Sequence, residues 1–228
     1  MPSDSVRPLI LAVDTTGENG SIALARGRDL LEEIPLHAPA GFAQVLLASA
    51  AALLERNGVK VGDVDCFAAA SGPGSFTGLR VGLSFIKGLA EATGKRAVAV
   101  SNLRTLACFG TAPLRAAVID ARRGQIYGAV YDDQGNALSP EVVSGCVDWL
   151  QSLPEGEIGF VTASPAFLEE ARAGTRYATA PLTVPPASLA AAVASIAAEA
   201  YERGQALDPA TLDANYVRRS DAELFWRE

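Results

Sequence analysis

Short apolar runs alternate with longer segments of helical periodicity along the first half of the chain. The first three runs are separated by short turns that contain Gly, which predicts three strands joined by hairpins. Gly58, directly after the first helical segment, is a typical helix C-cap. The elements predicted for this half are strands at residues 9–14, 20–25, 30–36, 66–70 and 97–100 and helices at residues 42–57 and 78–93.

The pattern then restarts. Residues 9–14 (LILAVD) and 115–120 (RAAVID) are similar, and each is followed by a short turn and another strand-like run, which indicates an internal duplication. We expect two lobes, residues 1–106 and 107–228, hinged near residues 103–113. The elements predicted for the second half are strands at residues 116–120, 125–131 and 158–162, helices at 147–150, 165–172 and 188–203, and a proline-rich loop at 181–186.

Residues 71–82 form a glycine-rich corner, Ser-Gly-Pro-Gly-Ser-Phe-Thr-Gly-Leu-Arg-Val-Gly, between a predicted strand and the second predicted helix. Ser75 and Thr77 are suitable N-caps for that helix. A glycine loop at a helix N-terminus could hold an anion. The corner is not a P-loop, however, because no Gly-Lys-Ser/Thr follows at the required spacing.

Both predicted helices of the first lobe carry apolar residues on more than one face. This exceeds the single stripe of a surface helix, so a second buried face is expected, in contact with a partner. Gly78, Gly82 and Ile86 are expected at a close helix–helix contact across that interface. The alternative is that these glycines pack inside their own lobe. The residues assigned to the interface are Phe42, Val45, Leu46, Ser49, Leu53, Gly78, Val81, Gly82, Phe85 and Ile86.

Composition indicates a folded, acidic protein, with 49% hydrophobic residues and a formal net charge of −7 over 228 residues. This negative charge argues against binding of nucleic acid by the chain alone, so contact with RNA would need a partner protein. No apolar run is long enough to span a membrane, and the N-terminal residues lack the pattern of a signal peptide. Cys66, Cys108 and Cys146 are expected to be buried thiols in the cytoplasm.

Patterns that would indicate catalysis are sparse. His37 is the only histidine, so no metal site with two His ligands can form. Residues 74–78, Gly-Ser-Phe-Thr-Gly, do not match the Gly-x-Ser-x-Gly motif of serine hydrolases. The neighbouring carboxylates Asp132 and Asp133 would point to opposite faces of a strand. We therefore expect no catalytic residue, no metal and no cofactor.

Two strand-turn-strand segments carry an acidic residue at the end of their first strand. The turns comprise Asp14, Thr15, Thr16 and Gly17 in the first half and Asp120, Arg122 and Gly124 in the second. This arrangement resembles the actin, sugar-kinase and heat-shock chaperone superfamily, in which paired turns flank nucleotide phosphates. The resemblance implies an α/β, two-lobed fold built from duplicated β-β-β-α-β-α units, with a reduced second lobe. Arg122 and Arg123 stand where small residues normally admit phosphates, so we interpret the turns as degenerate.

Residues 11–16, 71–82 and 119–127 together resemble the bacterial TsaB family, once called YeaZ, and the run Gly-Pro-Gly-Ser-Phe-Thr-Gly-x-Arg-x-Gly is its most diagnostic part. Residues 215–218 are similar to that family's C-terminal Tyr-Leu-Arg. The resemblance implies a non-catalytic subunit that pairs with TsaD, and with TsaE in a larger assembly, to make threonylcarbamoyladenosine beside the tRNA anticodon. Relatives often carry His where this chain has Phe42.

Two other functions stay open at this stage. A small ATP-binding kinase or ATPase of the same superfamily is disfavoured by the arginines of the second turn and by the absence of a Gly-Gly pair. A peptidase role is difficult to sustain with one histidine. We also expect the free protein to form a homodimer through the helices at residues 42–57 and 78–93, because such apolar surface rarely stays solvated.

Overall fold

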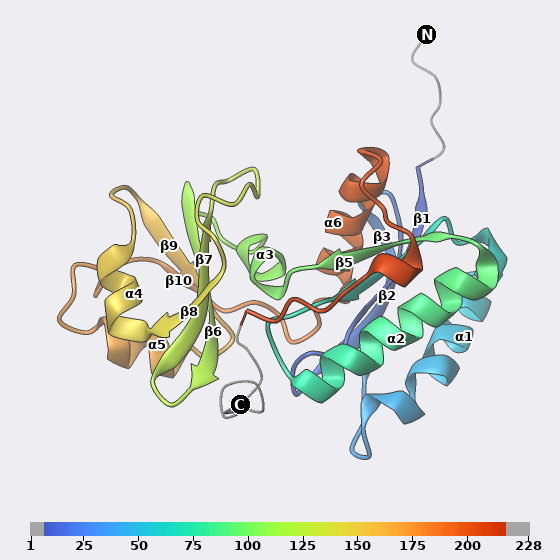
Figure 1. Ribbon diagram of the computed structural model, residues 1–228, viewed down its shortest axis with the longest axis horizontal. Helices are drawn as coiled ribbons and strands as arrows, with labels where there is room; N and C mark the ends of the chain where they lie inside the picture. The colour runs from blue at the N-terminus through green and yellow to red at the C-terminus, as the bar shows by residue number, and fades with distance from the viewer. Residues whose placement is uncertain (1–6, 218–228) are drawn as a thin grey trace, which may run out of the picture. The chain divides into compact units, whose positions relative to one another are not determined.

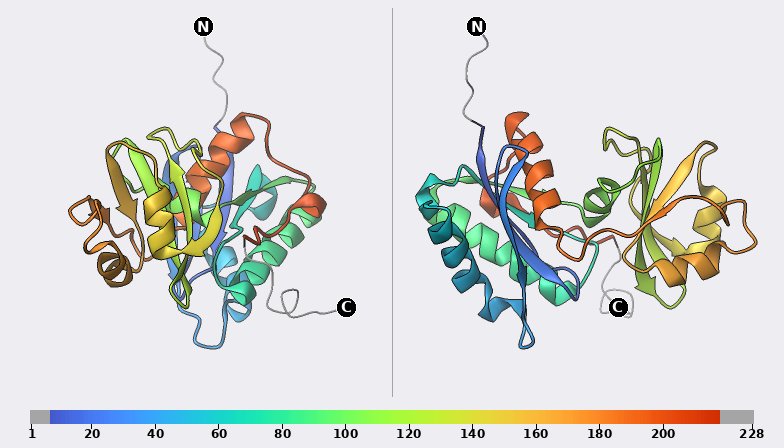
Figure 2. Two further views of the ribbon diagram at one scale, coloured as in Figure 1. Left: turned by 60° about the vertical axis from the view of Figure 1, so that its left-hand side comes forward. Right: turned by 180° about the vertical axis from the view of Figure 1, so that it is seen from behind.

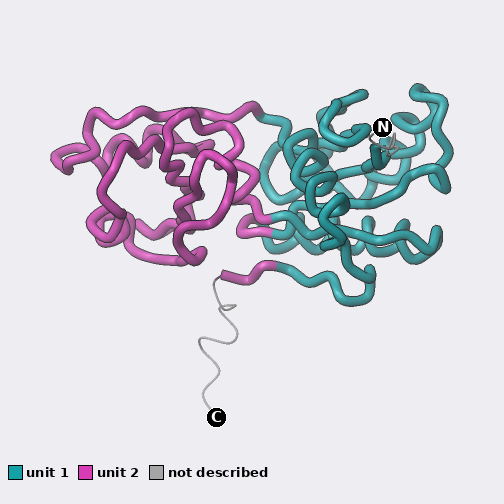
Figure 3. The backbone as a smooth tube through the Cα atoms, turned by 90° about the horizontal axis from the view of Figure 1, so that it is seen from above, with its two compact units in different colours: residues 1–71, 75–100, 187–214 teal, residues 72–74, 101–186, 215–228 magenta. Residues whose placement is uncertain are grey.

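The structure is a computed structural model that describes residues 7–217. The chain divides into two compact units (Figure 3). Among the described residues, the first unit contains residues 7–71, 75–100 and 187–214, and the second contains residues 72–74, 101–186 and 215–217. Within the described part of the chain, no helix combines the length and the apolar character needed to cross a lipid bilayer.

The first unit is built around a five-stranded sheet with the strand order β3-β2-β1-β4-β5 (Figure 1). β1 pairs with β2 in antiparallel and with β4 in parallel orientation. Every residue of β1 is buried, as its uninterrupted apolar run predicts for a central strand. The strands are β1 (Leu9–Asp14), β2 (Gly20–Arg26), β3 (Asp29–Leu36), β4 (Cys66–Ala70) and β5 (Arg96–Val100).

Helices cover both faces of this sheet (Figure 2). Alternate residues of β1 face opposite ways: Leu11 packs in the cluster formed with α1 and α2, whereas Ile10 and Ala12 pack against α6. α2 begins at the N-cap Ser75, whose Oγ accepts a hydrogen bond from Gly78 N at 3.3 Å. The helices are α1 (Leu46–Arg56), α2 (Phe76–Thr93) and α6 (Ala190–Glu202).

The second unit repeats this design around a sheet with the order β10-β9-β6-β7-β8. Its buried cluster includes Val118, Trp149 and Phe160, so α4 and α5 pack against the sheet. The strands are β6 (Leu114–Arg122), β7 (Gln125–Tyr131), β8 (Val142–Gly145), β9 (Ile158–Val161) and β10 (Leu182–Thr183). The helices are α3 (Asn102–Ala107), α4 (Cys146–Ser152) and α5 (Pro165–Arg172).

The two sheets have the same topology, which confirms the predicted α/β fold with an internal duplication. Reading each sheet through the hairpin into the parallel strands gives β3-β2-β1-β4-β5 in one unit and β8-β7-β6-β9-β10 in the other. In both, the first two strand pairs are antiparallel and the last two are parallel.

The division of the chain differs from the expected boundary near residue 106, because residues 72–74 and 101–106 group with the second unit and α6 groups with the first. α6 follows the second repeat in sequence but packs on β1, β2 and β4 of the first unit. Its buried face is made mainly of small residues such as Ala194 and Ala197, which fit closely against Ala12 and Ala68 of the strands. An Ala-rich helix carries no signal that indicates which of two similar sheets it covers.

Several element boundaries also differ from those predicted. Residues 42–57 do not form one helix, since a 3₁₀ turn at Phe42–Gln44 precedes α1. α3 occupies part of the expected hinge, and β10 lies inside the expected proline-rich loop. β8 was not predicted. α3, β8 and β10 are six, four and two residues long, which is too short to give a clear periodicity.

Candidate functional site

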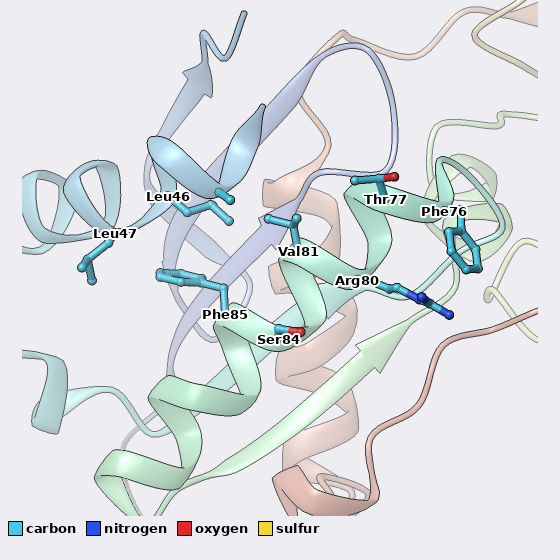
Figure 4. Close-up of a pocket in the computed structure, with 9 residues that line it drawn as sticks. Leu46, Leu47, Phe76, Thr77, Arg80, Val81, Ser84 and Phe85 are labelled. Carbon is cyan, nitrogen blue, oxygen red and sulfur yellow. The ribbon is translucent and has the colours of Figure 1, made fainter. Parts of the chain in front are cut away.

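A groove of about 500 Å³ lies between the start of α1 and the first half of α2 on the first unit (Figure 4). Val81 and Phe85 project from α2 on the side that faces Leu46 and Leu47 of α1. The groove is therefore mainly apolar. Its lining residues are Ala43, Leu46, Leu47, Phe76, Thr77, Arg80, Val81, Ser84 and Phe85.

Two large apolar side chains at this groove are open to solvent. Leu47 is 68% exposed and Phe76 is 48% exposed, and both line the same groove. The Arg80 guanidinium lies 3.8 Å from the centre of the Phe76 ring, in a cation–π contact. This end of the groove thus combines an aromatic surface with a cation, and the other end is lined by Leu46, Leu47 and Phe85.

Three residues assigned to the interface from the sequence also line the groove, namely Leu46, Val81 and Phe85. Leu46 is 1% exposed and contributes to the core as well, while Val81 and Phe85 are half-buried. Phe42, Val45 and Ser49 are also half-buried but do not line the groove. Sequence reasoning missed Phe76 and Arg80, because a helix N-terminus and a polar position both looked solvent-facing.

Other residues assigned to the interface lie inside the unit, and that part of the assignment is wrong. Leu53 and Ile86 are both 0% exposed, and they belong to the hydrophobic core between the helices and the sheet. Gly78 and Gly82 are also buried. The expected close helix–helix contact across an interface, made by Gly78, Gly82 and Ile86, is therefore not available to a partner.

Gly78 and Gly82 lie where α2 crosses the turn that follows β1, and there is no room for a side chain at either position. A Cβ at Gly78 would lie 1.9 Å from the carbonyl oxygen of Thr15, and one at Gly82 would lie 2.5 Å from Thr15 Oγ1. The Thr15 hydroxyl donates a hydrogen bond to Gly78 O at 2.7 Å. The two motifs of the first lobe, the Asp-Thr-Thr turn and the glycine-rich helix, are thus in direct contact.

The first turn is held by hydrogen bonds between its own residues. Asp14 Oδ1 accepts hydrogen bonds from Thr16 N at 2.9 Å and from Thr16 Oγ1 at 2.6 Å. Ser75 N at the start of α2 donates to Thr16 O at 2.7 Å. Asp14 is 3% exposed, and burial raises the pKa of its carboxyl group, with the hydrogen bonds from Thr16 acting in the opposite direction. Gly17, next in the chain, is exposed.

The second turn repeats the same local hydrogen bond. Asp120 Oδ1 accepts from Arg122 N at 2.7 Å, two residues further on, as Asp14 does from Thr16. The turn differs in its exposure, because Arg122, Arg123 and Gly124 all lie at the surface. The duplication therefore extends from the sheet topology to the bonding of the turns, and the side chains that follow each Asp differ.

The residues considered for catalysis do not converge. His37 is exposed, and among residues 7–217 no three His, Cys, Asp or Glu side chains lie close enough together to hold a metal ion. Cys66 and Cys146 are buried as expected, but Cys108 is exposed, because it follows the last turn of the short helix α3. That part of the cysteine prediction is corrected.

Asn215 of the C-terminal segment is held within the second unit. Its Nδ2 donates to Glu141 Oε2 at 2.5 Å and to Gly72 O at 3.4 Å. The hydroxyls of Ser101 and Tyr131 also donate to Glu141. Burial, and next the Glu141 charge, raise the pKa of Tyr131. Arg218, the last residue of the predicted C-terminal similarity, and the rest of the tail lie outside the described residues.

Comparison with known proteins gives consistent matches. The family model described as "TsaD: tRNA N6-adenosine threonylcarbamoyltransferase" matches residues 34–203. The chain is 33% identical to "tRNA threonylcarbamoyladenosine biosynthesis protein TsaB" of Bacillus subtilis over 64% of this chain and 66% of that protein. It is 34% identical to the protein of the same name from Escherichia coli over 57% of both. The matched regions thus span less than two thirds of these relatives.

Solved structures extend the similarity to nearly the whole chain. The structure titled "YeaZ from Pseudomonas aeruginosa" superposes with a TM-score of 0.77 and 26% identity, over 92% of this chain and 99% of that one. The ROK hexokinase from Thermus thermophilus superposes with a TM-score of 0.50 and 13% identity, over 86% of this chain and 99% of that one. At that identity the hexokinase shows the fold alone, which is that of the sugar-kinase and actin-like proteins.

Proposed function

The chain belongs to the TsaB family, also called YeaZ, and from this premise we propose that it is a non-catalytic subunit in the formation of threonylcarbamoyladenosine in tRNA. In this role it pairs with TsaD, the threonylcarbamoyltransferase, and joins TsaE in a larger assembly. It meets tRNA as part of that assembly, in the cytoplasm. The names of the relatives support the pathway, and the surface of the first unit supports the pairing.

The groove between α1 and α2 is the observation that carries this proposal. A partner that covered it would bury Leu47 and Phe76, two large apolar side chains that are otherwise solvated. Buried apolar and aromatic anchors near the centre of a contact supply most of the binding free energy in protein complexes. Arg80 lies beside Phe76 and could pair with a carboxylate on the partner.

The same surface accounts for self-association when the partner is missing. Apolar patches of this kind on a soluble protein are commonly covered. A second copy of the chain offers an identical patch, so a two-fold symmetric contact is available. We infer that the homodimer and the pair with TsaD use the same groove and exclude one another.

A pair of matched variants tests the proposal. Leu47→Glu places a charge in the groove, and Leu138→Glu places one on a similarly exposed leucine of the second unit, with exposures of 68% and 52%. Leu and Glu have similar helix propensities, so Leu47→Glu is not expected to weaken α1. If Leu47 is an anchor, its variant should bind TsaD at least about 30-fold more weakly, equivalent to about 2 kcal/mol, and Leu138→Glu should bind normally.

The measurements are affinity for purified TsaD, thermal melting, and mass in solution without the partner. We expect Leu47→Glu to melt like the wild type, to lose TsaD and to be monomeric. Equal TsaD affinity for the two variants would rule out the groove as the contact. Threonylcarbamoyl transfer by the chain in the absence of TsaD would contradict a non-catalytic role.

A further inference from the structure

The β6–β7 hairpin of the second unit carries two adjacent arginines in an uncommon backbone conformation (Figure 1). Arg122 has φ 67°, Arg123 has φ 57°, and Gly124 that follows has φ 73°. Left-handed conformations are readily adopted by Gly and by Asn, and residues with longer side chains adopt them rarely. A tight hairpin of this kind normally selects Asn-Gly or Gly-containing pairs.

The surrounding structure holds this turn from both ends. Asp120 Oδ1 accepts from Arg122 N at 2.7 Å, and Gly124 O accepts from Cys146 N at 3.1 Å. The pairing of β6 with β7 is irregular between Asp120 and Arg122. The backbone of the turn is thereby fixed, and both arginine side chains are directed to solvent.

The charges of the turn are accessible. The Arg122 side chain is 80% exposed and forms a long ion pair with Asp120, at 3.5 Å between Nη1 and Oδ2. An exposed pair of this length contributes little and leaves the guanidinium free to bind another anion. Arg123 is also exposed, and its side chain makes no hydrogen bond or ion pair within the described part of the chain. Two consecutive residues thus each present an exposed guanidinium group on a protein of net charge −7.

The neighbours of the arginines indicate which kind of anion they suit. Protein–protein interfaces usually have an apolar core, with most of their charged residues at a polar rim around it. Within the hairpin itself, Ala121 and Ile126 are buried, and Gly124 and Gln125 have no apolar side chain to offer at the surface. A phosphodiester backbone needs no apolar core, and guanidinium groups bind phosphate oxygens through two parallel hydrogen bonds.

We propose that the Arg122–Arg123 turn, called here the arginine turn, contacts the phosphate backbone of RNA when the chain is part of its tRNA-modifying complex. This inference rests on the proposed function, since the acidic chain alone is poorly suited to hold RNA. The contact is independent of RNA sequence and positions the substrate. The strained conformation is retained because the favoured turn residues, Asn and Gly, carry no charge.

The test uses the complex of the full chain with TsaD and an unmodified tRNA transcript as the probe. The variant Arg122→Asn/Arg123→Gly removes both charges and installs residues that suit the turn. A matched control, Arg28→Gln/Arg96→Gln, removes two charges from exposed positions of the first unit. We expect the turn variant to melt no lower than wild type, to bind the transcript roughly tenfold more weakly near 0.1 M salt, and to lower the salt slope of binding by about 1.5.

The controls separate the possible outcomes. Equal loss of RNA affinity in both double variants would mean that net charge alone matters and would overturn the inference. Unchanged RNA affinity in the turn variant would also overturn the inference. Loss of TsaD binding by the turn variant would overturn it as well, because the arginines would then contact an acidic protein surface and not RNA. Failure of the wild-type chain to bind TsaD at all would contradict the proposed function instead.

Discussion

Ser21 and Glu33, on the neighbouring strands β2 and β3, together cap a helix that lies far away in the sequence. Ser21 Oγ donates to Glu33 Oε1 at 3.0 Å and accepts from Leu189 N and Ala190 N at 3.1 and 2.9 Å. Glu33 Oε1 also accepts from Ala191 N at 3.0 Å. The N-cap residue of α6 is Leu189, which makes no side-chain cap bond, so the strands supply the missing acceptors.

Ser21→Ala should therefore destabilise the first unit although it deletes only one atom. Ser21 is 0% exposed, so the variant removes a buried acceptor of the N–H groups of Leu189 and Ala190. Loss of a cap or of a buried acceptor costs about 1–2 kcal/mol. Urea unfolding followed by circular dichroism measures the change in the free energy of unfolding.

Ser164→Ala is the matched control for Ser21→Ala. Ser164 is the N-cap residue of α5, and its side chain makes no cap hydrogen bond. Its replacement should change the free energy of unfolding by less than about 0.5 kcal/mol, as for ordinary surface substitutions. Equal effects of the two substitutions would mean that the bonds of Ser21 do not stabilise α6.

Much of the fold could be predicted because its strands are apolar runs of ordinary length. The duplication could be read from the similarity of residues 9–14 and 115–120, and the sheets confirm it. The position of α6 could not be predicted, because its capping partners Ser21 and Glu33 are polar strand residues with no local sign of that role. Long-range contacts of this kind leave no periodic pattern in the sequence.

The candidate site could be predicted only in part. The excess of apolar residues on α1 and α2 predicts a partner surface on these helices, and a mainly apolar groove lies between them. The face was assigned wrongly for the glycines, since a small residue fits a close contact inside the unit as well as one between proteins. The position of the Thr15 carbonyl oxygen against α2 shows that the contact lies inside the unit.

Asp14→Asn should reveal the electrostatic effect of burying the first turn. Burial raises the pKa of Asp14, so the folded protein favours the protonated carboxyl group. The contribution of this group to the free energy of unfolding is fully present below the unfolded pKa of about 3.9, and it is lost as pH rises through the folded pKa. Asn keeps an oxygen that can accept the bonds from Thr16. The variant should therefore gain stability relative to wild type with rising pH, by about 1.4 kcal/mol for each tenfold change in proton affinity.

Chemical denaturation of both proteins between pH 4 and pH 8 measures this difference. The two curves should converge towards pH 4 and separate towards neutrality. A variant that becomes less stable than wild type at neutral pH, relative to pH 4, would mean that the charged carboxylate is stabilised in the folded protein.

Thiol reactivity should distinguish the three cysteines. Burial, with a smaller effect of Asp65, raises the pKa of Cys66 to about 12, and burial followed by Asp120 raises the pKa of Cys146. Cys108 is exposed, so it should be the one thiol that reacts rapidly with a chromogenic disulfide reagent in the native protein. Cys108→Ser should abolish that fast phase, and unfolding in urea should release three thiols from the wild type. A fast phase that survives the substitution would show that a buried cysteine becomes accessible.

Gly82 and Gly88 of α2 provide a comparison within one helix. A Cβ at Gly82 would lie 2.5 Å from Thr15 Oγ1, whereas one at Gly88 would meet no atom of the described residues within 4 Å beyond its own helix. Gly88→Ala should stabilise the protein by up to about 1 kcal/mol through helix propensity. Gly82→Ala gains the same propensity but must displace the Thr15 side chain, so we expect net destabilisation of about 1–2 kcal/mol.

The sign of the Gly82 effect tests where this face of α2 packs. If Gly82 faced a partner, Gly82→Ala would stabilise the isolated chain as Gly88→Ala does and would weaken only the complex with TsaD. We expect instead a lower melting temperature for the isolated chain, because Thr15 also donates to Gly78 O and cannot move without breaking that bond. Gly82→Arg, with a much larger side chain at the same place, should prevent folding of the first unit, whereas Gly88→Arg should melt within a few degrees of wild type.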